Sequence, residues 1–225
     1  MHQVDARPLG PGLPWDYEAL ARAHARSAHA LLDIGTGGAE RLARIVAGLP
    51  VQVVATEGWA VNVPLAARRL APLGGQVVRC SSCQLPFRDA RFDLVLSRHT
   101  ALGPDEVLRV LRSGGSIVTQ QVDQSHWHEL SHFFTMQDFG DHFTRYREAF
   151  RAAGLQVTTA RHEQPVAYAN LADVVFLLLV APWQVPGFNP RRDLDALLAF
   201  EDAQRTPDGI ILTESRYLIV AEDRP

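Results

Sequence analysis

A glycine-rich turn between two acidic residues is the part of the sequence best suited to chemistry. Residues 31–38 read Leu-Leu-Asp-Ile-Gly-Thr-Gly-Gly. Glycine lets a backbone turn sharply and approach a ligand where a side chain would collide, and the helix expected next offers unpaired N–H groups at its start. The turn therefore indicates a nucleotide-like cofactor, and a tight turn that holds no ligand is the alternative.

The acidic residues around the turn indicate which of two classes of cofactor it would bind. A dinucleotide-binding turn has the pattern Gly-x-Gly-x-x-Gly, and in that register the third glycine falls on Glu40. The carboxylate of Glu40 and that of Asp33, at the end of the preceding apolar run, would both repel phosphate groups. We therefore expect a cofactor that carries an ammonium group and a ribose.

A second acid, Glu57, follows the next apolar run, residues 51–56. At the tip of a second strand, a carboxylate can accept hydrogen bonds from the ribose hydroxyls of a nucleoside. The alternative is an exposed acid that a helix N-terminus stabilises. Gly58 extends this turn, and Trp59 is expected either to pack on the adenine or to belong to the core.

A later strand ends in Ser97, Arg98 and His99. An imidazole titrates near neutral pH, so His99 is the candidate catalytic base or substrate-orienting group, with a helix-capping or loop histidine as the alternative. Arg98 is a candidate contact for a carboxylate of the cofactor or for the substrate.

Two patterns that resemble metal or redox sites are expected to mislead. The Cys80-x-x-Cys83 pair lacks the helix that activates a redox pair, and the chain has no further cysteines for structural zinc. His128 and His132 match the zinc-protease pattern His-Glu-x-x-His, with His126 nearby, but a metalloprotease also needs a third ligand and a cleft, and five-residue patterns often arise by chance. We expect no metal site, while an adventitious metal or a polar substrate contact at these histidines stays open.

The glycine turn resembles the first motif of the class I (Rossmann-like) S-adenosylmethionine-dependent methyltransferases, Asp-x-Gly-x-Gly-x-Gly. Asp33, Gly35 and Gly37 match this motif, and Ala39 replaces its last glycine. In that family the turn wraps the methionine part of the cofactor, and an acid at the position of Glu57 binds the ribose. The resemblance therefore implies that S-adenosylmethionine is the cofactor.

Two further segments resemble a large subgroup of this family. Leu85-Pro86-Phe87 is followed by Phe92-Asp93-Leu94-Val95, and Gly114-Gly115 resembles the turn before the family's fifth strand. Where the subgroup has an acid for the adenine amino group, this chain has Ser81, whose hydroxyl bonds an amine without charge assistance. The motifs cover residues 30–122, and the later segments resemble bacterial members in outline. The resemblance implies cofactor contacts from Asp33, Gly35, Thr36, Gly37, Glu57, Gly58, Trp59, Ser81, Ser82, Ser97 and Arg98.

Strand-like and helix-like segments alternate along the chain, which implies a mainly parallel sheet covered on both faces. Strands are expected at residues 30–34, 51–56, 76–79, 92–97, 116–122, 155–161 and 210–221. Helices are expected at residues 14–29, 40–49, 61–73, 104–111, 143–153 and 171–180. The predicted fold is a three-layer α/β/α sandwich with a mostly parallel seven-stranded sheet and one antiparallel strand near the C-terminus.

Length and composition favour a single domain. A chain of 225 residues, 47% of them hydrophobic, can bury one core, so one domain is expected over residues 1–225. We expect an N-terminal arm and helix at residues 1–29. Substrate-capping segments, rich in aromatic residues and histidine, are expected at residues 123–142 and 165–190.

Hydropathy and charge also limit the partners and functions that we expect for the protein. Apolar runs are too short to span a membrane, and the N-terminal residues do not resemble a secretion signal, so a cytoplasmic protein is expected. The net charge is −3 and the arginines are scattered, which argues against a nucleic-acid partner. The predicted function is methyl transfer from S-adenosylmethionine to a small molecule, by a monomer or homodimer. The alternatives are a catalytically silent protein that binds S-adenosylmethionine and an RNA base methyltransferase.

Overall fold

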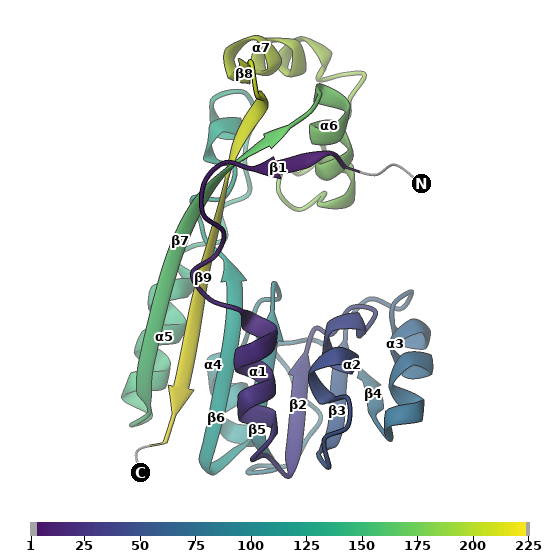
Figure 1. Ribbon diagram of the computed structural model, residues 1–225, viewed down its shortest axis with the longest axis vertical. Coiled ribbons are helices and arrows are strands. Elements are labelled where there is room, and N and C mark those ends of the chain that lie inside the picture. The colour runs from purple at the N-terminus through teal and green to yellow at the C-terminus, as the bar shows by residue number, and fades with distance from the viewer. Residues whose placement is uncertain (1–3, 224–225) are drawn as a thin grey trace. The chain divides into compact units, whose positions relative to one another are not determined.

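The computed structural model describes residues 4–223, and in this part of the chain nine strands form one mixed sheet. The strand order is β1-β7-β9-β6-β5-β2-β3-β4, with β8 paired to β9. The parallel strands are β2 (Ala30–Ile34), β3 (Gln52–Glu57), β4 (Gln76–Arg79), β5 (Phe92–Arg98) and β6 (Leu111–Val122) (Figure 1). β9 (Gly209–Glu222) lies between β6 and β7 (Gln156–Tyr168) and runs in the opposite direction to them. The predicted α/β fold, with its antiparallel strand near the C-terminus, is confirmed.

The prediction of seven strands was wrong, because two short strands join the sheet. β1 (Ala6–Pro8) pairs with β7, and β8 (Arg205–Thr206) forms an antiparallel hairpin with the start of β9. β1 lies in the segment that was predicted as an N-terminal arm. Strands of two or three residues are too short to show the alternation of apolar and polar residues that reveals a strand in sequence.

Six of the helices correspond to the predicted ones, and most of them are shorter than predicted. They are α1 (Tyr17–Ala25), α2 (Glu40–Val46), α3 (Val63–Leu70), α4 (Pro104–Val110), α5 (His142–Ala152) and α6 (Leu171–Val180). A seventh, α7 (Leu194–Gln204), was not predicted; it buries only Leu197 and Phe200, so its periodic signal is weak. Two 3₁₀ helices, η1 (Ala71–Leu73) and η2 (His128–His132), complete the elements. Among the described residues, none of the helices has the length and hydropathy needed to cross a bilayer.

The chain divides into two compact units. The first unit comprises residues 4–14, 122–142 and 161–216, and the second comprises residues 15–121, 143–160 and 217–223. Both predicted capping segments fall within the first unit, while the glycine turn and the tips of β2, β3 and β5 belong to the second. The single domain over residues 1–225 and the capping role of these segments stay predictions.

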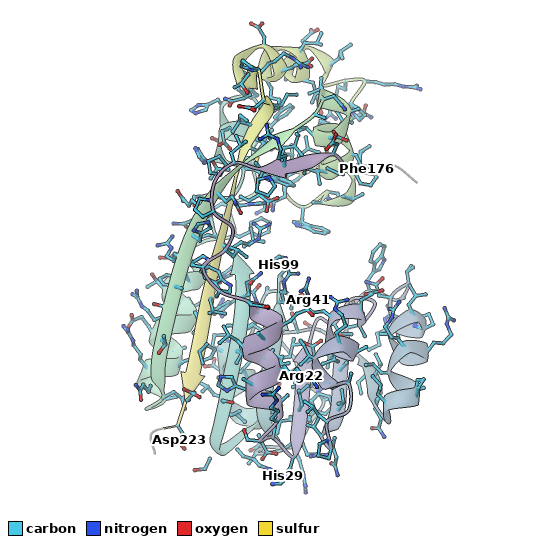
Figure 2. The ribbon with its side chains drawn as sticks, viewed as in Figure 1. Arg22, His29, Arg41, His99, Phe176 and Asp223 are labelled. Carbon is cyan, nitrogen blue, oxygen red and sulfur yellow. The ribbon has the colours of Figure 1, made fainter. Side chains whose placement is uncertain are left out.

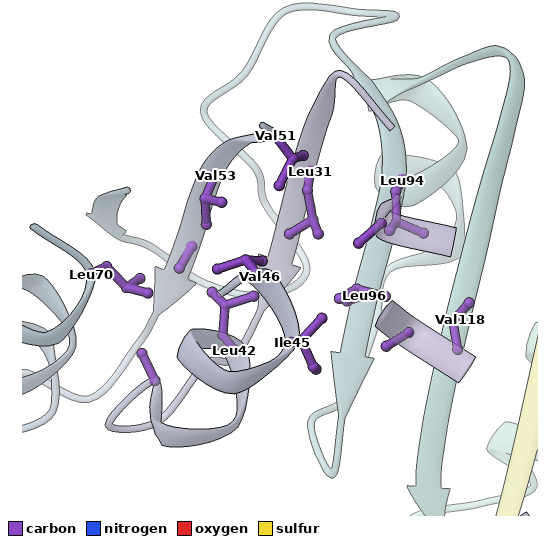
Figure 3. Packing of buried hydrophobic residues seen from close by; sticks show 14 of the residues in the cluster. Leu31, Leu42, Ile45, Val46, Val51, Val53, Leu70, Leu94, Leu96 and Val118 are labelled. Carbon is purple, nitrogen blue, oxygen red and sulfur yellow. The ribbon is translucent and has the colours of Figure 1, made fainter. Parts of the chain in front are cut away.

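Apolar side chains cover both faces of the sheet in the second unit. α1, α2 and α3 pack on one face, where Leu42, Ile45 and Val46 of α2 meet Leu31 and Leu94 of the sheet (Figure 3). α4 and α5 pack on the other face, which includes Leu32. Neighbouring residues of a strand point to opposite faces, so β2 is buried on both sides and its carboxyl end is fixed in place.

Candidate functional site

The glycine turn joins the end of β2 to α2 and has a left-handed backbone at three positions. Gly35 and Gly37 have φ angles of +71° and +61°. A β-carbon on residue 35 would also lie 2.6 Å from the Cβ atom of Thr100. Ala39, at the position of the family motif's last glycine, has φ of 61° and is fully buried. The left-handed backbone and the close approach of Thr100 thus explain the glycines of the motif. Alanine at position 39 adopts a left-handed conformation that glycine adopts more readily.

Glu57 closes this turn from the tip of β3. Its Oε2 atom accepts a hydrogen bond from the Gly37 N–H at 2.7 Å, and Oε1 accepts one from the Trp59 N–H at 2.8 Å. Carboxylate oxygens have two acceptor positions each, so Glu57 holds the turn and retains capacity for a ligand hydroxyl. The side chain of Trp59 is 66% exposed, so this tryptophan does not belong to the core.

A pocket of about 80 Å³ lies beside the turn in the second unit. Three of its lining side chains carry acidic or strongly basic groups: the carboxyl group of Asp33 and the guanidinium groups of Arg41 and Arg98. Figure 2 shows Arg41 and His99 at the same end of the sheet. The full lining is Tyr17, Asp33, Gly35, Thr36, Arg41, Leu42, Ile45 and Arg98.

The protonation of Asp33 is perturbed by its surroundings. Burial raises the pKa of its carboxyl group to about 7; the Thr36 hydroxyl opposes this shift, and the Glu57 carboxylate adds to it. The Thr36 hydroxyl oxygen is itself buried and completes no hydrogen bond of regular geometry. An acid of raised pKa beside an unsatisfied hydroxyl is typical of a site built for a polar ligand.

Tyr17 forms one wall of the pocket from α1. Its hydroxyl donates a hydrogen bond to the Ser97 carbonyl oxygen at 3.3 Å. Burial, with a further contribution from Asp33, keeps the pKa of the phenol well above its usual value, so Tyr17 stays neutral. The Ser97 hydroxyl accepts a hydrogen bond from Gln121 Nε2 at 3.3 Å and is buried; its contact with the cofactor stays a prediction.

The loop after β4, where the adenine contacts were predicted, is tied to α4. Arg109 donates hydrogen bonds to the carbonyl oxygens of Leu85 and Phe87, and Glu106 accepts the Leu85 N–H at 2.8 Å. The Leu85-Pro86-Phe87 motif is therefore a clamped segment that fixes the preceding loop. In that loop the Ser81 hydroxyl accepts the Cys83 N–H at 3.2 Å.

His99 follows β5 with an exposed side chain and a left-handed backbone, φ 57°. Its N–H donates to the Gln120 carbonyl oxygen at 2.9 Å, and its Nε2 atom lies 3.1 Å from Nε2 of Gln120. His99 therefore lies at the same edge of the sheet as Asp33, attached to the end of β6.

Two residues of the histidine-rich segment form hydrogen bonds within the first unit. Glu129 accepts hydrogen bonds from the N–H and the hydroxyl of Thr213, at 2.9 and 2.6 Å. His126 Nδ1 accepts the Ser215 N–H at 3.2 Å. Within residues 4–223, no group of three or more His, Cys, Asp or Glu side chains is placed to hold a metal ion.

Sequence reasoning missed several residues of the site. Arg41 was missed although it lies in the first turn of the helix after the glycines, and Tyr17 was included only in the helix expected at residues 14–29. Glu40, which was expected to repel phosphate groups, forms an ion pair with Arg69 at 2.6 Å. The negative charge of Glu40 is thus partly offset by Arg69. Asp33 is therefore the acid that argues against a phosphate-bearing ligand in the pocket.

The segment that carries most of this site matches a known family model. Residues 32–119 match the family model of a methyltransferase domain, a segment that contains the glycine turn, Glu57 and the clamped Leu85-Pro86-Phe87 motif. No curated protein matches the chain by sequence.

Several solved structures share the fold. A proposed methyltransferase from Bacillus halodurans C-125 is 16% identical, with a TM-score of 0.68 over 93% of this chain and 99% of that chain. The [4+2]-cyclase SpnF is 18% identical, with a TM-score of 0.57 over 92% of this chain and 80% of its own. A geranyl diphosphate methyltransferase, solved with GPP and sinefungin, is 16% identical, with a TM-score of 0.55 over 92% and 77% of the two chains.

The fold and the matched segment carry different information about the class of protein. The sheet is Rossmann-like, and at these identities the solved structures carry the fold alone. The family match over residues 32–119 adds a likeness to a methyltransferase domain in that segment. Membership of the class I S-adenosylmethionine-dependent methyltransferases, and of their subgroup with the Leu-Pro-Phe motif, stays a prediction.

Proposed function

We propose that this protein binds S-adenosylmethionine at the glycine turn and transfers its methyl group to a small-molecule acceptor. The observation that carries the proposal is the charge pattern of the pocket, where the carboxyl group of Asp33 is opposed by the guanidinium groups of Arg41 and Arg98. An amino-acid group, with its ammonium and carboxylate, matches these opposite charges. The pyrophosphate of a dinucleotide would meet the carboxyl group of Asp33 unfavourably.

The other residues of the site fit the same cofactor. The buried Thr36 hydroxyl has no regular hydrogen-bond partner in the protein, and the left-handed Gly35 and Gly37 leave the backbone open to a ligand. In the proposed complex Asp33, Gly35, Thr36 and Gly37 hold the methionine part. Glu57 and Gly58 bind the ribose. The adenine is bound by Trp59, Ser81 and Ser82. The carboxylate of the methionine part is bound by Arg98 and Ser97.

When bound, the cofactor supplies a methyl group on a sulfonium, ready for in-line displacement. The contribution of the protein is to hold nucleophile and methyl group in line, which supplies much of the rate in reactions of this kind. Asp33 and the two arginines fix the amino-acid end, and the neutral Tyr17 closes the pocket wall. His99, at the tip of β5, is the residue proposed to orient the acceptor.

A small acceptor is favoured over a nucleic acid by the charge of the chain. With a net charge of −3 and no lysine, the protein lacks the excess of cations that non-specific phosphate binding uses. A catalytically silent cofactor-binding protein is the second candidate. Ser81 in place of an acid favours it, and the [4+2]-cyclase among the structures of this fold illustrates that the fold does not dictate methyl transfer.

Calorimetry with S-adenosylhomocysteine tests the cofactor. We expect binding to the wild-type chain, loss of binding in Asp33→Ala, and no change in Asp202→Ala, a control at an exposed acid of α7. Absence of heat at millimolar ligand would overturn the proposal. Transfer of a labelled methyl group across a panel of small metabolites, with transfer RNA as a separate arm, then distinguishes the small-molecule enzyme from the RNA enzyme and from the silent binder.

A further inference from the structure

A chain of two side-chain hydrogen bonds connects Trp15, Gln120 and His99, all in the second unit. Nε1 of Trp15 donates to Oε1 of Gln120 at 2.8 Å, and Nε2 of Gln120 lies 3.1 Å from Nε2 of His99. The Gln120 residue is only 2% exposed, so water does not compete freely for its amide group. The orientation of that amide is therefore set by its protein partners.

Hydrogen-bonding capacity determines which atom donates at each step. The indole N–H of Trp15 can only donate, so the Gln120 atom that faces it is the carbonyl oxygen. The NH₂ group of Gln120 consequently faces His99, and an amide NH₂ group can only donate hydrogen bonds. Nε2 of His99 must accept this bond, which requires it to carry no proton, and a neutral imidazole then carries its proton on Nδ1.

The backbone around His99 reinforces the arrangement. The carbonyl oxygen of Gln120 accepts the N–H of His99 at 2.9 Å, so one residue of β6 holds both the main chain and the ring of His99. The next residue, Gln121, accepts the Thr100 N–H at 2.8 Å. The ring is thus fixed against a strand instead of being a freely rotating loop side chain.

We propose that Trp15 and Gln120 are positioning residues that hold His99 as the neutral Nδ1–H tautomer and thereby set which ring nitrogen can act on the methyl acceptor. The tautomer of His99 follows from hydrogen bonds within the protein, whereas its role toward the methyl acceptor rests on the proposed function. His99 in this state does not remove a proton through Nε2. The fitting substrate class therefore presents a nucleophilic atom that is already unprotonated.

Nuclear magnetic resonance of ¹⁵N-histidine-labelled protein tests the tautomer directly, with His99→Asn used to assign the signal. At pH 8 we expect a single tautomer with the proton on Nδ1. Trp15→Phe keeps an aromatic ring but removes the indole N–H, so the Gln120 amide can turn and both tautomers should appear. Trp183→Phe, at an exposed tryptophan of the first unit, is the matched control and should leave the signal unchanged.

A second variant covers the case in which Trp15→Phe does not fold. Gln120→Glu replaces a donor by an acceptor, so the proton should move to Nε2 of His99, whereas Gln52→Glu at an exposed position of β3 should not affect it. A wild-type ring protonated on Nε2, or a tautomer unchanged in both Trp15→Phe and Gln120→Glu, would overturn the inference. These spectra need no cofactor, so a failure to bind S-adenosylhomocysteine would count against the proposed function and leave the tautomer result standing.

Discussion

The side chain of Thr100 occupies the space that a β-carbon on Gly35 would need. The backbone of Thr100 is held by Gln121, whose amide nitrogen in turn donates to Thr119 at 2.8 Å and to Ser97 at 3.3 Å. The loop after β5 and the glycine turn after β2 are therefore packed against each other without a gap. A change in either loop is expected to disturb the other.

Gly35→Ala tests this packing. We expect loss of S-adenosylhomocysteine binding and a decrease of about 2–4 kcal/mol in the free energy of unfolding, from the left-handed backbone and the collision with Thr100. Gly48→Ala is the matched control, because Gly48 has the same φ of +71° and its β-carbon would meet nothing within 4 Å. Urea unfolding of both variants measures the difference, and an equal loss of stability in the two would contradict the role of Thr100.

The raised pKa of Asp33 makes folding stability depend on pH. The native state holds this proton up to about pH 7, while the unfolded chain releases it near its ordinary value. The native state therefore binds more protons in between, so the stability contributed by this group is complete below about pH 4 and is lost as the pH rises through 7. Asp33→Asn should remove that slope, as urea unfolding between pH 4 and pH 8 would reveal; a slope identical to that of the wild type would contradict the assignment.

Ligand affinity should change with pH in the opposite direction. An ammonium group beside Asp33 favours the ionised carboxyl, so the affinity for S-adenosylhomocysteine should rise as the pH increases through about 7. Binding below pH 7 should release a proton, which calorimetry detects as a binding enthalpy that varies with the ionisation enthalpy of the buffer. In Asp33→Asn the proton release should vanish; if it persists, another group is responsible.

The two arginines of the pocket should recognise only the amino-acid end of the ligand. Arg98→Met should weaken S-adenosylhomocysteine binding by about tenfold or more, which corresponds to roughly 1.4 kcal/mol. It should leave unchanged the affinity for 5′-methylthioadenosine, which has the same adenosine but no amino-acid group. Equal losses for the two ligands would indicate a general disruption of the site. Arg41→Met should behave in the same way, because Arg41 lines the same pocket.

The clamp of α4 on the Leu85-Pro86-Phe87 motif should contribute to stability at neutral pH. Hydrogen bonds from Arg109 and from the Leu85 N–H lower the pKa of Glu106 to about 2. The stability from Glu106 is thus present above its ordinary pKa and is lost as the pH falls toward 2. Glu106→Gln should cost about 1–2 kcal/mol at pH 7, whereas Glu148→Gln, at an exposed ion pair, should cost little. Similar losses in the two variants would show that the clamp is no stronger than a surface ion pair.

Much of the framework could be predicted because local patterns specify it. The apolar runs of β2, β3 and β5 and the glycines after β2 are contiguous in sequence, so strand, turn and helix could be identified from spacing alone. Asp33 and Glu57 follow from the same reasoning, since the carboxyl ends of parallel strands meet at one edge. The short strands β1 and β8 and the weakly amphipathic α7 lack such patterns.

The finer chemistry depends on contacts between distant residues and was not predictable from spacing. Trp15 and Gln120 are separated by 105 positions, and the bond between them gives the histidine ring its orientation. Arg41 enters the pocket because α2 begins immediately after the turn, which a count of residue types does not reveal. The raised pKa of Asp33 arises mainly from burial, a property of the folded chain.

The exposed indole of Trp59 gives the proposed site an optical reporter of its own. Its N–H is tied to Glu57 while two-thirds of the side chain faces solvent, so a ligand that covers this ring should shift its fluorescence emission. Trp127 is buried and Trp15 is half-buried, and Trp183 can be replaced by phenylalanine. Ligand occupancy could then be followed in a simple titration, without a label and before any acceptor is identified.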